Sequence, residues 1–132
     1  MNTTGTNKKV ITQYVAAFNQ GDSDALRKLF THDAVIQGVL GWGEIEKIIP
    51  IWRELHEAFA IELSIEETVA EGDTVAVRYL ERGKSVGSFR GGGVTGKPYE
   101  IVAMEWFQMR DGKIARRWGA RDSASQNRQM GL

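Results

Sequence analysis

The residues that most suggest chemistry are Trp118 and Asp122, an aromatic ring and a carboxylate four positions apart near the end of the chain. Side chains at every second position of a strand share a face, so both are expected on one wall. At ~3.3 Å per residue they would lie about 13 Å apart, the length of a multi-ring molecule. The small residues Ala103 and Ala120 would leave space between them. This combination predicts a pocket for a small hydrophobic organic ligand.

Two further residues are candidates for acid–base chemistry. Glu105 either projects into the same pocket and accepts a proton, or pairs with Arg116, a diagonal neighbour ~7–8 Å away on the next strand. His56 lies on the apolar face of a predicted helix. There it is either a pocket residue with a chemical role or a hydrogen-bonded core histidine. The other histidine, His32, is interpreted as part of a turn.

Aromatic side chains supply the expected ligand contacts. Core packing is the usual role of aromatic residues on helices and strands, so a contact with ligand has to be argued from position. Trp42, for example, lies in a Gly-Trp-Gly turn that would flank the mouth of a pocket. The residues expected to contact the ligand are Trp118, Trp52, Trp42, Tyr14, Phe18 and Phe107.

The composition argues against several classes of function. Lys plus Arg equals Asp plus Glu at 17 each, so nothing in the net charge favours a nucleic acid or an anionic membrane as partner. Without cysteine there is no thiolate metal site or iron–sulfur cluster. Two histidines far apart in sequence do not predict a metal site, and we expect no cofactor. The glycine-rich stretch 91–97 has P-loop spacing, but Pro98 replaces the required Ser or Thr.

The N-terminal residues 1–9 are polar and do not resemble a signal peptide. No apolar run approaches the ~20 residues that span a bilayer. From these features and the lack of cysteine, we expect a cytoplasmic protein without a membrane partner.

Apolar periodicity predicts helices first and strands afterwards. Helices are expected over residues 8–20, from Asp22 or Ser23 to about 30, and over 44–58, where Pro50 either starts or kinks the helix. Strands are expected over 34–39, from 61 to a turn at 71–73, and over 74–82, 99–110 and 113–122. This order predicts one α+β domain over residues 1–132, with helices on one face of an antiparallel sheet. Residues 1–7 and 124–132 are expected to be loose tails.

The Asp111–Gly112 pair is the strongest hairpin signal in the chain. A two-residue turn pairs Arg110 with Lys113 and Glu105 with Trp118. A three-residue turn with a glycine bulge would shift this register by one. In either register, alternation is expected to place the following residues on one face of the last strand: Ile114, Arg116, Trp118, Ala120 and Asp122.

The strand over 101–109 is apolar on both faces, with Ile101 and Phe107 on one side and Val102 and Trp106 on the other. An antiparallel sheet in a monomer usually leaves one face in water. Two apolar faces therefore predict that helices cover one face and a second copy of the chain covers the other, in a homodimer.

The chain resembles the SnoaL-like polyketide cyclases, within the nuclear transport factor two and ketosteroid isomerase superfamily. The resemblance covers nearly the whole chain and rests on the order and spacing of several segments. These are residues 14–22 (YVAAFNQGD), 30–35 (FTHDAV), 71–75 (EGDTV), Gly87, Phe89, 95–97 (TGK), 111–114 (DGKI), Trp118 and Asp122.

The resemblance implies a cystatin-like, nuclear transport factor two-like cone, in which a bent antiparallel sheet closed by N-terminal helices holds the ligand. It also implies that Asp122, on the last strand, acts as general acid or base in an intramolecular aldol closure. Apolar surroundings would raise the pKa of that carboxyl from ~3.9 and make proton exchange useful at neutral pH. One position departs from the family pattern, because Ser85 stands where the cyclases carry a loop histidine.

The sequence therefore supports three hypotheses. The first is a cofactor-independent cyclase or isomerase that acts on a small apolar carbonyl compound by acid–base catalysis. The second is a protein that binds a hydrophobic ligand without transforming it, which the missing loop histidine favours. The third is a hydratase or hydrolase on the same scaffold.

Overall fold

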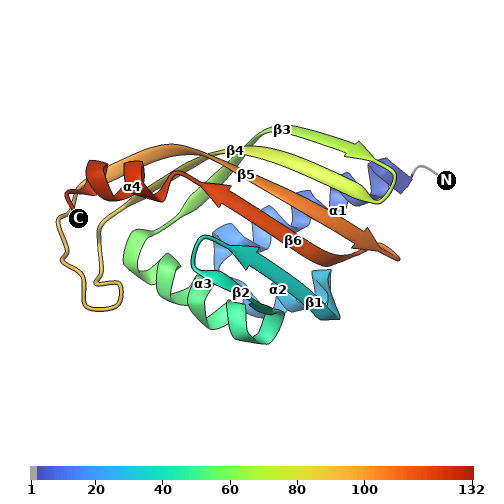
Figure 1. The fold of residues 1–132 in the computed structure, drawn as a ribbon, viewed down its shortest axis with the longest axis horizontal. Coiled ribbons are helices and arrows are strands. Elements are labelled where there is room, and N and C mark those ends of the chain that lie inside the picture. The colour runs from blue at the N-terminus through green and yellow to red at the C-terminus, as the bar shows by residue number, and fades with distance from the viewer. Residues whose placement is uncertain (1–2) are drawn as a thin grey trace.

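A computed structural model describes residues 3–132 and contains four helices and six strands in that range. The strands form one sheet in the order β2-β1-β6-β5-β4-β3. Figure 1 shows the elements, whose bounds are α1 (Thr3–Gln20), α2 (Ser23–Leu29), β1 (Phe30–Gly38), β2 (Gly41–Glu44), α3 (Ile45–Phe59), β3 (Glu62–Glu71), β4 (Thr74–Lys84), β5 (Pro98–Arg110), β6 (Lys113–Arg121) and α4 (Ser123–Met130).

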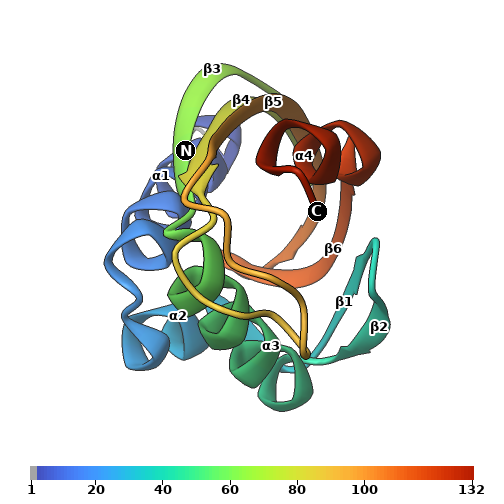
Figure 2. The ribbon, with the colours of Figure 1, turned by 90° about the vertical axis from the view of Figure 1, so that its left-hand side faces the viewer.

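The sheet curves strongly, and α1, α2 and α3 lie on its concave side (Figure 2). This arrangement confirms the predicted α+β cone. The pairing is antiparallel except between β1 and β6, which run parallel. The purely antiparallel sheet expected from the sequence is therefore wrong at this one pair. β2 was also missed, because four residues around Trp42 are too few to show a strand period.

The N-terminal helices follow their sequence signals closely. In α1 the residues of one face are buried, including Ile11, Tyr14 and Phe18. The helix begins at Thr3, so the prediction of a loose tail is wrong for residues 3–7, where the side chain of Asn7 is 2% exposed. Residues 1–2 of that predicted tail lie outside the described residues. Asp22 caps α2, because its Oδ1 accepts a hydrogen bond from the amide of Ala25 at 3.0 Å.

The third helix, α3, passes through Pro50 rather than starting there. Proline at this sixth helical position removes one backbone hydrogen bond, a loss that the burial of the wide apolar face of the helix offsets. The last residue of the helix is Phe59, and Ala60 caps it. Ala60 has a φ of 47°, and its amide donates to the carbonyl of His56 at 2.8 Å. Among the described residues, no helix is both long and apolar enough to span a membrane.

Strand β5 alternates strictly between buried and exposed residues along its whole length. Glu105 and Phe107 face the concave interior and are buried. On the convex face, Val102, Met104 and Trp106 are 48%, 54% and 52% exposed. Helices thus cover one face of the strand, as predicted, while an apolar patch remains on the other.

The β5–β6 hairpin confirms the Asp111–Gly112 turn and corrects the register beyond it. Arg110 pairs with Lys113 and Met109 with Ile114, as a two-residue turn requires. An irregularity then leaves Ala115 unpaired, so that Gln108 faces Arg116. One extra residue in a strand exchanges its two faces. Arg117, Gly119 and Arg121 therefore face inward with Ile114, whereas Arg116, Trp118 and Ala120 do not.

The C-terminal residues form helix α4, so the loose tail expected at 124–132 is wrong. Gln129 ties the helix to β5, with its Oε1 accepting from the Glu100 amide at 2.9 Å and its Nε2 donating to the Glu100 carbonyl at 3.1 Å. Met130 is completely buried. Side-chain anchoring of this kind leaves little signal in a polar sequence.

Candidate functional site

A cavity of about 570 Å³ lies between the concave face of the sheet and the helices. Its apolar wall comes from α1, α3 and the neighbouring strands and includes Phe18, Ile36, Ile48, Trp52, Phe59 and Leu63. Polar side chains gather on the sheet side, where Tyr14, Tyr79, Glu81, Glu105, Arg117 and Arg121 contribute to the lining. A cavity of this size, mostly apolar and with a few polar groups, is typical of a small-molecule site.

Five of the residues predicted to act at the site line the cavity. Tyr14 and Phe18 contribute from α1, Trp52 from α3 and Glu105 from β5. Trp42, on β2, is 68% exposed and lies beside the apolar tip of the β1–β2 hairpin, which also lines the cavity. For Tyr14, Phe18 and Trp52 the inward direction follows from helix periodicity, whereas Trp42 was expected at the pocket mouth because of its Gly-Trp-Gly turn.

Asp122 does not line the cavity, so its predicted position is wrong. It is an exposed residue immediately after β6, where it caps α4 by accepting a hydrogen bond from the Ser125 amide at 2.9 Å. The extra residue at Ala115 changes which residues of β6 face inward, and the strand ends before Asp122.

Trp118, Phe107 and His56 also lie outside the cavity lining. Trp118 shares the convex face with Arg116, whose guanidinium carbon lies 4.7 Å from the centre of its ring. Phe107 is fully buried in the core, 5.3 Å from the Tyr14 ring. His56 lies with its Nε2 3.2 Å from the carbonyl oxygen of Asn19, so it connects α3 to the end of α1.

The remaining predicted acid, Glu105, is the centre of a buried polar cluster. Its Oε2 accepts from Arg117 Nε at 2.5 Å, from Arg117 Nη2, and from the Tyr14 hydroxyl at 3.3 Å. The ion pair is therefore with Arg117 and not with Arg116, as the register change requires. Oε1 of Glu105 is buried and has no hydrogen-bond partner within residues 3–132. One carboxylate oxygen thus receives three donors while the other stays available.

A second buried ion pair lies at the other end of the cavity. Glu81 accepts from Arg121 Nε at 3.0 Å, from Arg121 Nη2, and from the Tyr99 hydroxyl at 2.6 Å. The two arginines are four residues apart on β6, which places them about 13 Å apart along the strand. Gly119 lies between them and, with Ala103 of β5, gives the cavity a floor of small residues.

These polar residues were missed at the sequence level, although β4 carried a usable signal. Every second residue of β4 is buried from position 75 to position 81. Val75, Val77, Tyr79 and Glu81 therefore lie on one face of the strand. Arg117 and Arg121 gave no such signal, because their inward direction depends on the irregularity at Ala115.

The buried tyrosines keep their protons. Burial, followed by the negative charge of Glu105, raises the pKa of Tyr14 and of Tyr79 well above its usual value. Burial and the charge of Glu81 do the same for the pKa of Tyr99. The Tyr79 hydroxyl has no hydrogen bond of standard geometry within the described residues, and its side-chain interaction with the Glu105 carboxylate adds to the rise in its pKa. It is therefore a neutral hydroxyl on the cavity wall, beside the Glu105 side chain.

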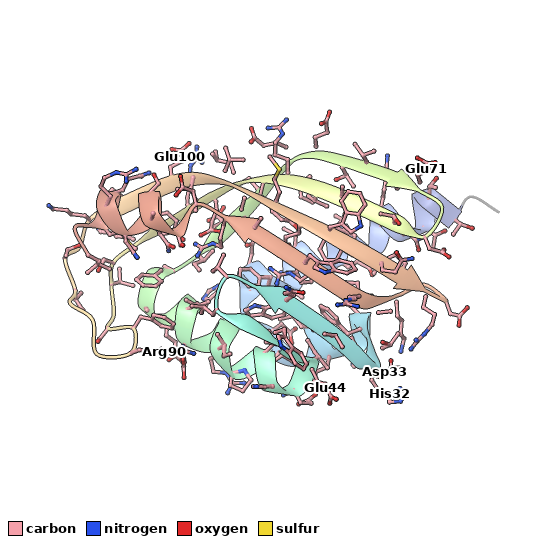
Figure 3. The ribbon with its side chains drawn as sticks, viewed as in Figure 1. His32, Asp33, Glu44, Glu71, Arg90 and Glu100 are labelled. Carbon is pink, nitrogen blue, oxygen red and sulfur yellow. The ribbon has the colours of Figure 1, made fainter. Side chains whose placement is uncertain are left out.

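Two other sequence features lie apart from the cavity. Ser85 is fully buried, and its Oγ accepts from the Thr95 amide at 3.0 Å, so it pins the long loop between β4 and β5. His32 is exposed at the start of β1, beside Asp33, and both point away from the interior (Figure 3). Within residues 3–132 no three His, Asp or Glu side chains form a group that could hold a metal ion.

Comparisons with known proteins agree with this architecture. A family model described as SnoaL-like domain matches residues 11–117. IdmH from Streptomyces antibioticus, a suggested polyketide cyclase, is 28% identical, with a TM-score of 0.85 over 96% of this chain and 99% of its own. No curated protein sequence matches the chain.

Two structures of lower sequence identity share the fold. A suggested SnoaL-like polyketide cyclase from Jannaschia sp. CCS1 is 21% identical, with a TM-score of 0.90 over 100% of this chain and 96% of its own. AclR from Streptomyces galilaeus, a suggested hydroxylase, is 22% identical, with a TM-score of 0.87 over 98% of this chain and 83% of its own. Since the family model spans most of the chain, including α3 and the sheet around the cavity, this protein belongs to the SnoaL-like domain family.

Proposed function

We propose that this protein is a cofactor-independent cyclase or isomerase that moves a proton on a small, largely apolar carbonyl compound, with Glu105 as the proton acceptor. The observation that carries the proposal is the asymmetry of this carboxylate. Three donors converge on Oε2, while Oε1 has no partner within the described residues. A carboxylate with one free oxygen on the wall of an apolar cavity is suited to general base catalysis.

The neighbouring hydroxyl supplies the second requirement. Removal of a proton next to a carbonyl creates an enolate, whose oxygen needs a fixed hydrogen-bond donor. Tyr79 is neutral and buried beside Glu105, its hydroxyl makes no hydrogen bond of standard geometry in residues 3–132, and burial raises its pKa, so it can donate to a ligand without losing its proton. Tyr14 and Arg117 hold the carboxylate in place.

The proposed steps balance without a further reactant. The C–H proton moves to Glu105, and its electron pair forms the enolate. In an isomerase, Glu105 returns the proton to another carbon of the same molecule. In a cyclase, the enolate carbon attacks a second carbonyl of that molecule, and the resulting alkoxide takes the proton from Glu105.

Hydrogen–deuterium exchange tests the proton transfer directly. The α-protons of 1-indanone and 2-tetralone are followed by NMR in D₂O, with and without the protein. Glu105→Gln is expected to lower the protein-dependent exchange rate by about 10²–10⁴. Asp122→Asn is the matched control, because it changes a carboxylate that only caps α4 and leaves a good capping residue. Loss of exchange in Asp122→Asn but not in Glu105→Gln would reject Glu105 as the base.

The second candidate function is binding without turnover. It is favoured by the ion pairs themselves, since both carboxylates on the cavity wall are held by an arginine. The same fold also occurs in AclR, which is described as a suggested hydroxylase, so the scaffold does not determine the reaction. If the two ketones bind with no protein-dependent exchange, binding is the better description. Protein-dependent hydration or hydrolysis of a carbonyl compound would instead favour a hydratase or hydrolase.

We further propose that the protein acts as a homodimer through the convex face of the sheet. The support is the apolar patch on β3 and β5, where Val69, Val102, Met104 and Trp106 are each about half exposed. Monomeric proteins rarely expose a contiguous apolar surface of this kind. A second copy of the same face would cover it by an isologous contact.

A further inference from the structure

Gln126 is a buried polar residue of α4 whose amide nitrogen is unpaired. Its side chain is on the cavity wall, and the residue is 3% exposed. Nε2 has no hydrogen-bond partner within residues 3–132. Buried amide groups in folded proteins are nearly always hydrogen-bonded. An unpaired amide on the wall of a cavity therefore indicates a group supplied by the ligand.

Residues of α4 other than Gln126 hold this helix against the sheet. Gln129, on the same helix, forms hydrogen bonds through both its amide oxygen and its amide nitrogen with the backbone of Glu100 on β5. Met130 is fully buried, and its carbonyl accepts from Thr95 Oγ1 at 2.5 Å. Asp122 caps the first turn. Gln126 is thus not needed to hold the helix on the sheet.

The charges around this end of the cavity cancel. Arg121, which directly precedes α4, is paired with Glu81, and at the other end of the cavity Arg117 is paired with Glu105. A ligand carboxylate or ammonium placed here would be buried without a counter-ion, which is strongly unfavourable. A neutral donor at the same end as the neutralised Arg121–Glu81 pair therefore fits a neutral acceptor, such as the oxygen of a ketone, an ester or an amide.

The position of Gln126 also sets the length of the ligand. Gln126 belongs to the helix that follows Arg121, while Glu105 binds Arg117, four residues earlier on the same strand. These two ends of the cavity are separated by about 13 Å along β6. Figure 1 shows α4 at one end of the sheet, with β5 and β6 running away from it. A ligand that reaches both ends must be extended.

We propose that Gln126 determines substrate specificity by donating an Nε2–H hydrogen bond to a neutral carbonyl or ester oxygen at the end of the ligand remote from Glu105. The substrate class is then a neutral, extended, multi-ring compound with an oxygen at each end. This inference rests on the proposed site, but it concerns recognition and does not require that turnover occur.

A matched pair of ligands tests the inference by binding alone. Methyl 6-hydroxy-2-naphthoate and 6-propyl-2-naphthol share a phenol at one end, but only the first has an ester oxygen at the other. Binding is measured by calorimetry and by quenching of tryptophan fluorescence. The unmodified protein is expected to bind the ester about tenfold more tightly, the usual effect of one buried hydrogen bond. Gln126→Met is expected to remove this preference and to leave the affinity for the propyl compound unchanged.

Two further variants separate the possible explanations. Gln129→Met alters the same residue type on the same helix outside the cavity, and it is expected to keep the ester preference even if it lowers the melting temperature. Glu105→Gln is expected to keep the preference while losing proton exchange, so failure of the proposed reaction is seen separately. The inference is wrong if the ester preference survives in Gln126→Met, if that variant weakens both ligands equally, or if the unmodified protein binds neither compound.

Discussion

The guanidinium of Arg117 lies directly over Gly119, two residues further along the same face of β6. A Cβ at position 119 would come within 2.7 Å of Arg117 Nη2 and 3.0 Å of its guanidinium carbon. Glycine therefore makes room for the arginine that holds Glu105. This relationship links the smallest residue of the cavity floor to the orientation of the proposed base.

Gly119→Ala is expected to displace the Arg117 guanidinium and to lower protein-dependent exchange of the ketone probes at least several-fold. The melting temperature should fall less than in Arg117→Met, because the displaced guanidinium is the end of a flexible side chain that can stay close to Glu105. Gly38→Ala is the control, since a Cβ there would meet Arg117 Nη1 at 3.6 Å, an ordinary contact. Equal effects of the two substitutions on exchange would contradict this role for Gly119.

The buried Glu105–Arg117 pair predicts a strongly non-additive response to mutation. The side chains are 6% and 12% exposed. Removing one partner of a buried pair leaves the other charge uncompensated, so Arg117→Met is expected to reduce the free energy of unfolding by about 3–5 kcal/mol. Glu105→Leu combined with Arg117→Met should recover much of that loss. Urea unfolding of the two single variants and the double variant measures the coupling, and additive losses would argue against the pair.

The tyrosines predict a specific alkaline transition. All three tyrosines of the chain, Tyr14, Tyr79 and Tyr99, are buried with a pKa raised above the ordinary value of 10.0. Below that value both the folded and the unfolded states keep their protons, so the tyrosines do not alter stability. Above it only the unfolded state ionises, and each tyrosine lowers the free energy of unfolding by ~1.4 kcal/mol per pH unit until its folded-state pKa is reached.

Absorbance at the tyrosinate band tests whether the free energy of unfolding falls with rising pH in this way. In denaturant the three side chains should titrate near their ordinary pKa. In the native protein no tyrosinate signal should appear until the chain unfolds, and circular dichroism should change at the same pH. A native-state titration with an ordinary midpoint, without loss of secondary structure, would show that the hydroxyls are accessible.

Gly83 lies where β4 passes closely by the end of α3. A Cβ there would lie 2.5 Å from the backbone oxygen of Phe59 and 2.5 Å from the Tyr99 ring. A backbone atom cannot move aside as easily as the end of a flexible side chain. Gly83→Ala should therefore reduce the free energy of unfolding by about 1–3 kcal/mol. Gly93→Ala, where the nearest atom would be 3.9 Å away, should leave the melting temperature unchanged.

The proposed dimer predicts a response to charge on the convex face. Trp106→Glu places a carboxylate in the centre of the exposed patch, where Trp106 now pairs with Trp118 of β6. The variant is expected to sediment as a folded monomer at micromolar concentration, where the unmodified protein sediments as a dimer. Glu100→Gln, on the same face of β5 but away from the apolar patch, serves as the control. A monomeric unmodified protein would reject the proposed assembly.

The sequence by itself determined the elements that depend on local periodicity and turn chemistry. The apolar face of α1, the cap at Asp22 and the turn at Asp111–Gly112 were all predictable, because each depends on residues close together in the chain. The resemblance to known cyclases added the cone and its concave pocket. These features placed Tyr14 and Trp52 correctly at the cavity, and they left open whether Glu105 faces it.

The identity of the charged residues at the site was decided only by the tertiary structure. Side chains on a strand alternate with a period of two, so the single unpaired residue Ala115 exchanges the two faces of the rest of β6. Arg117 and Arg121 thereby face the cavity, and Trp118 does not. Each arginine then meets a glutamate 12 or 40 positions away, Glu105 on β5 or Glu81 on β4, because the order of strands in the sheet brings them together. No local signal encodes such an encounter.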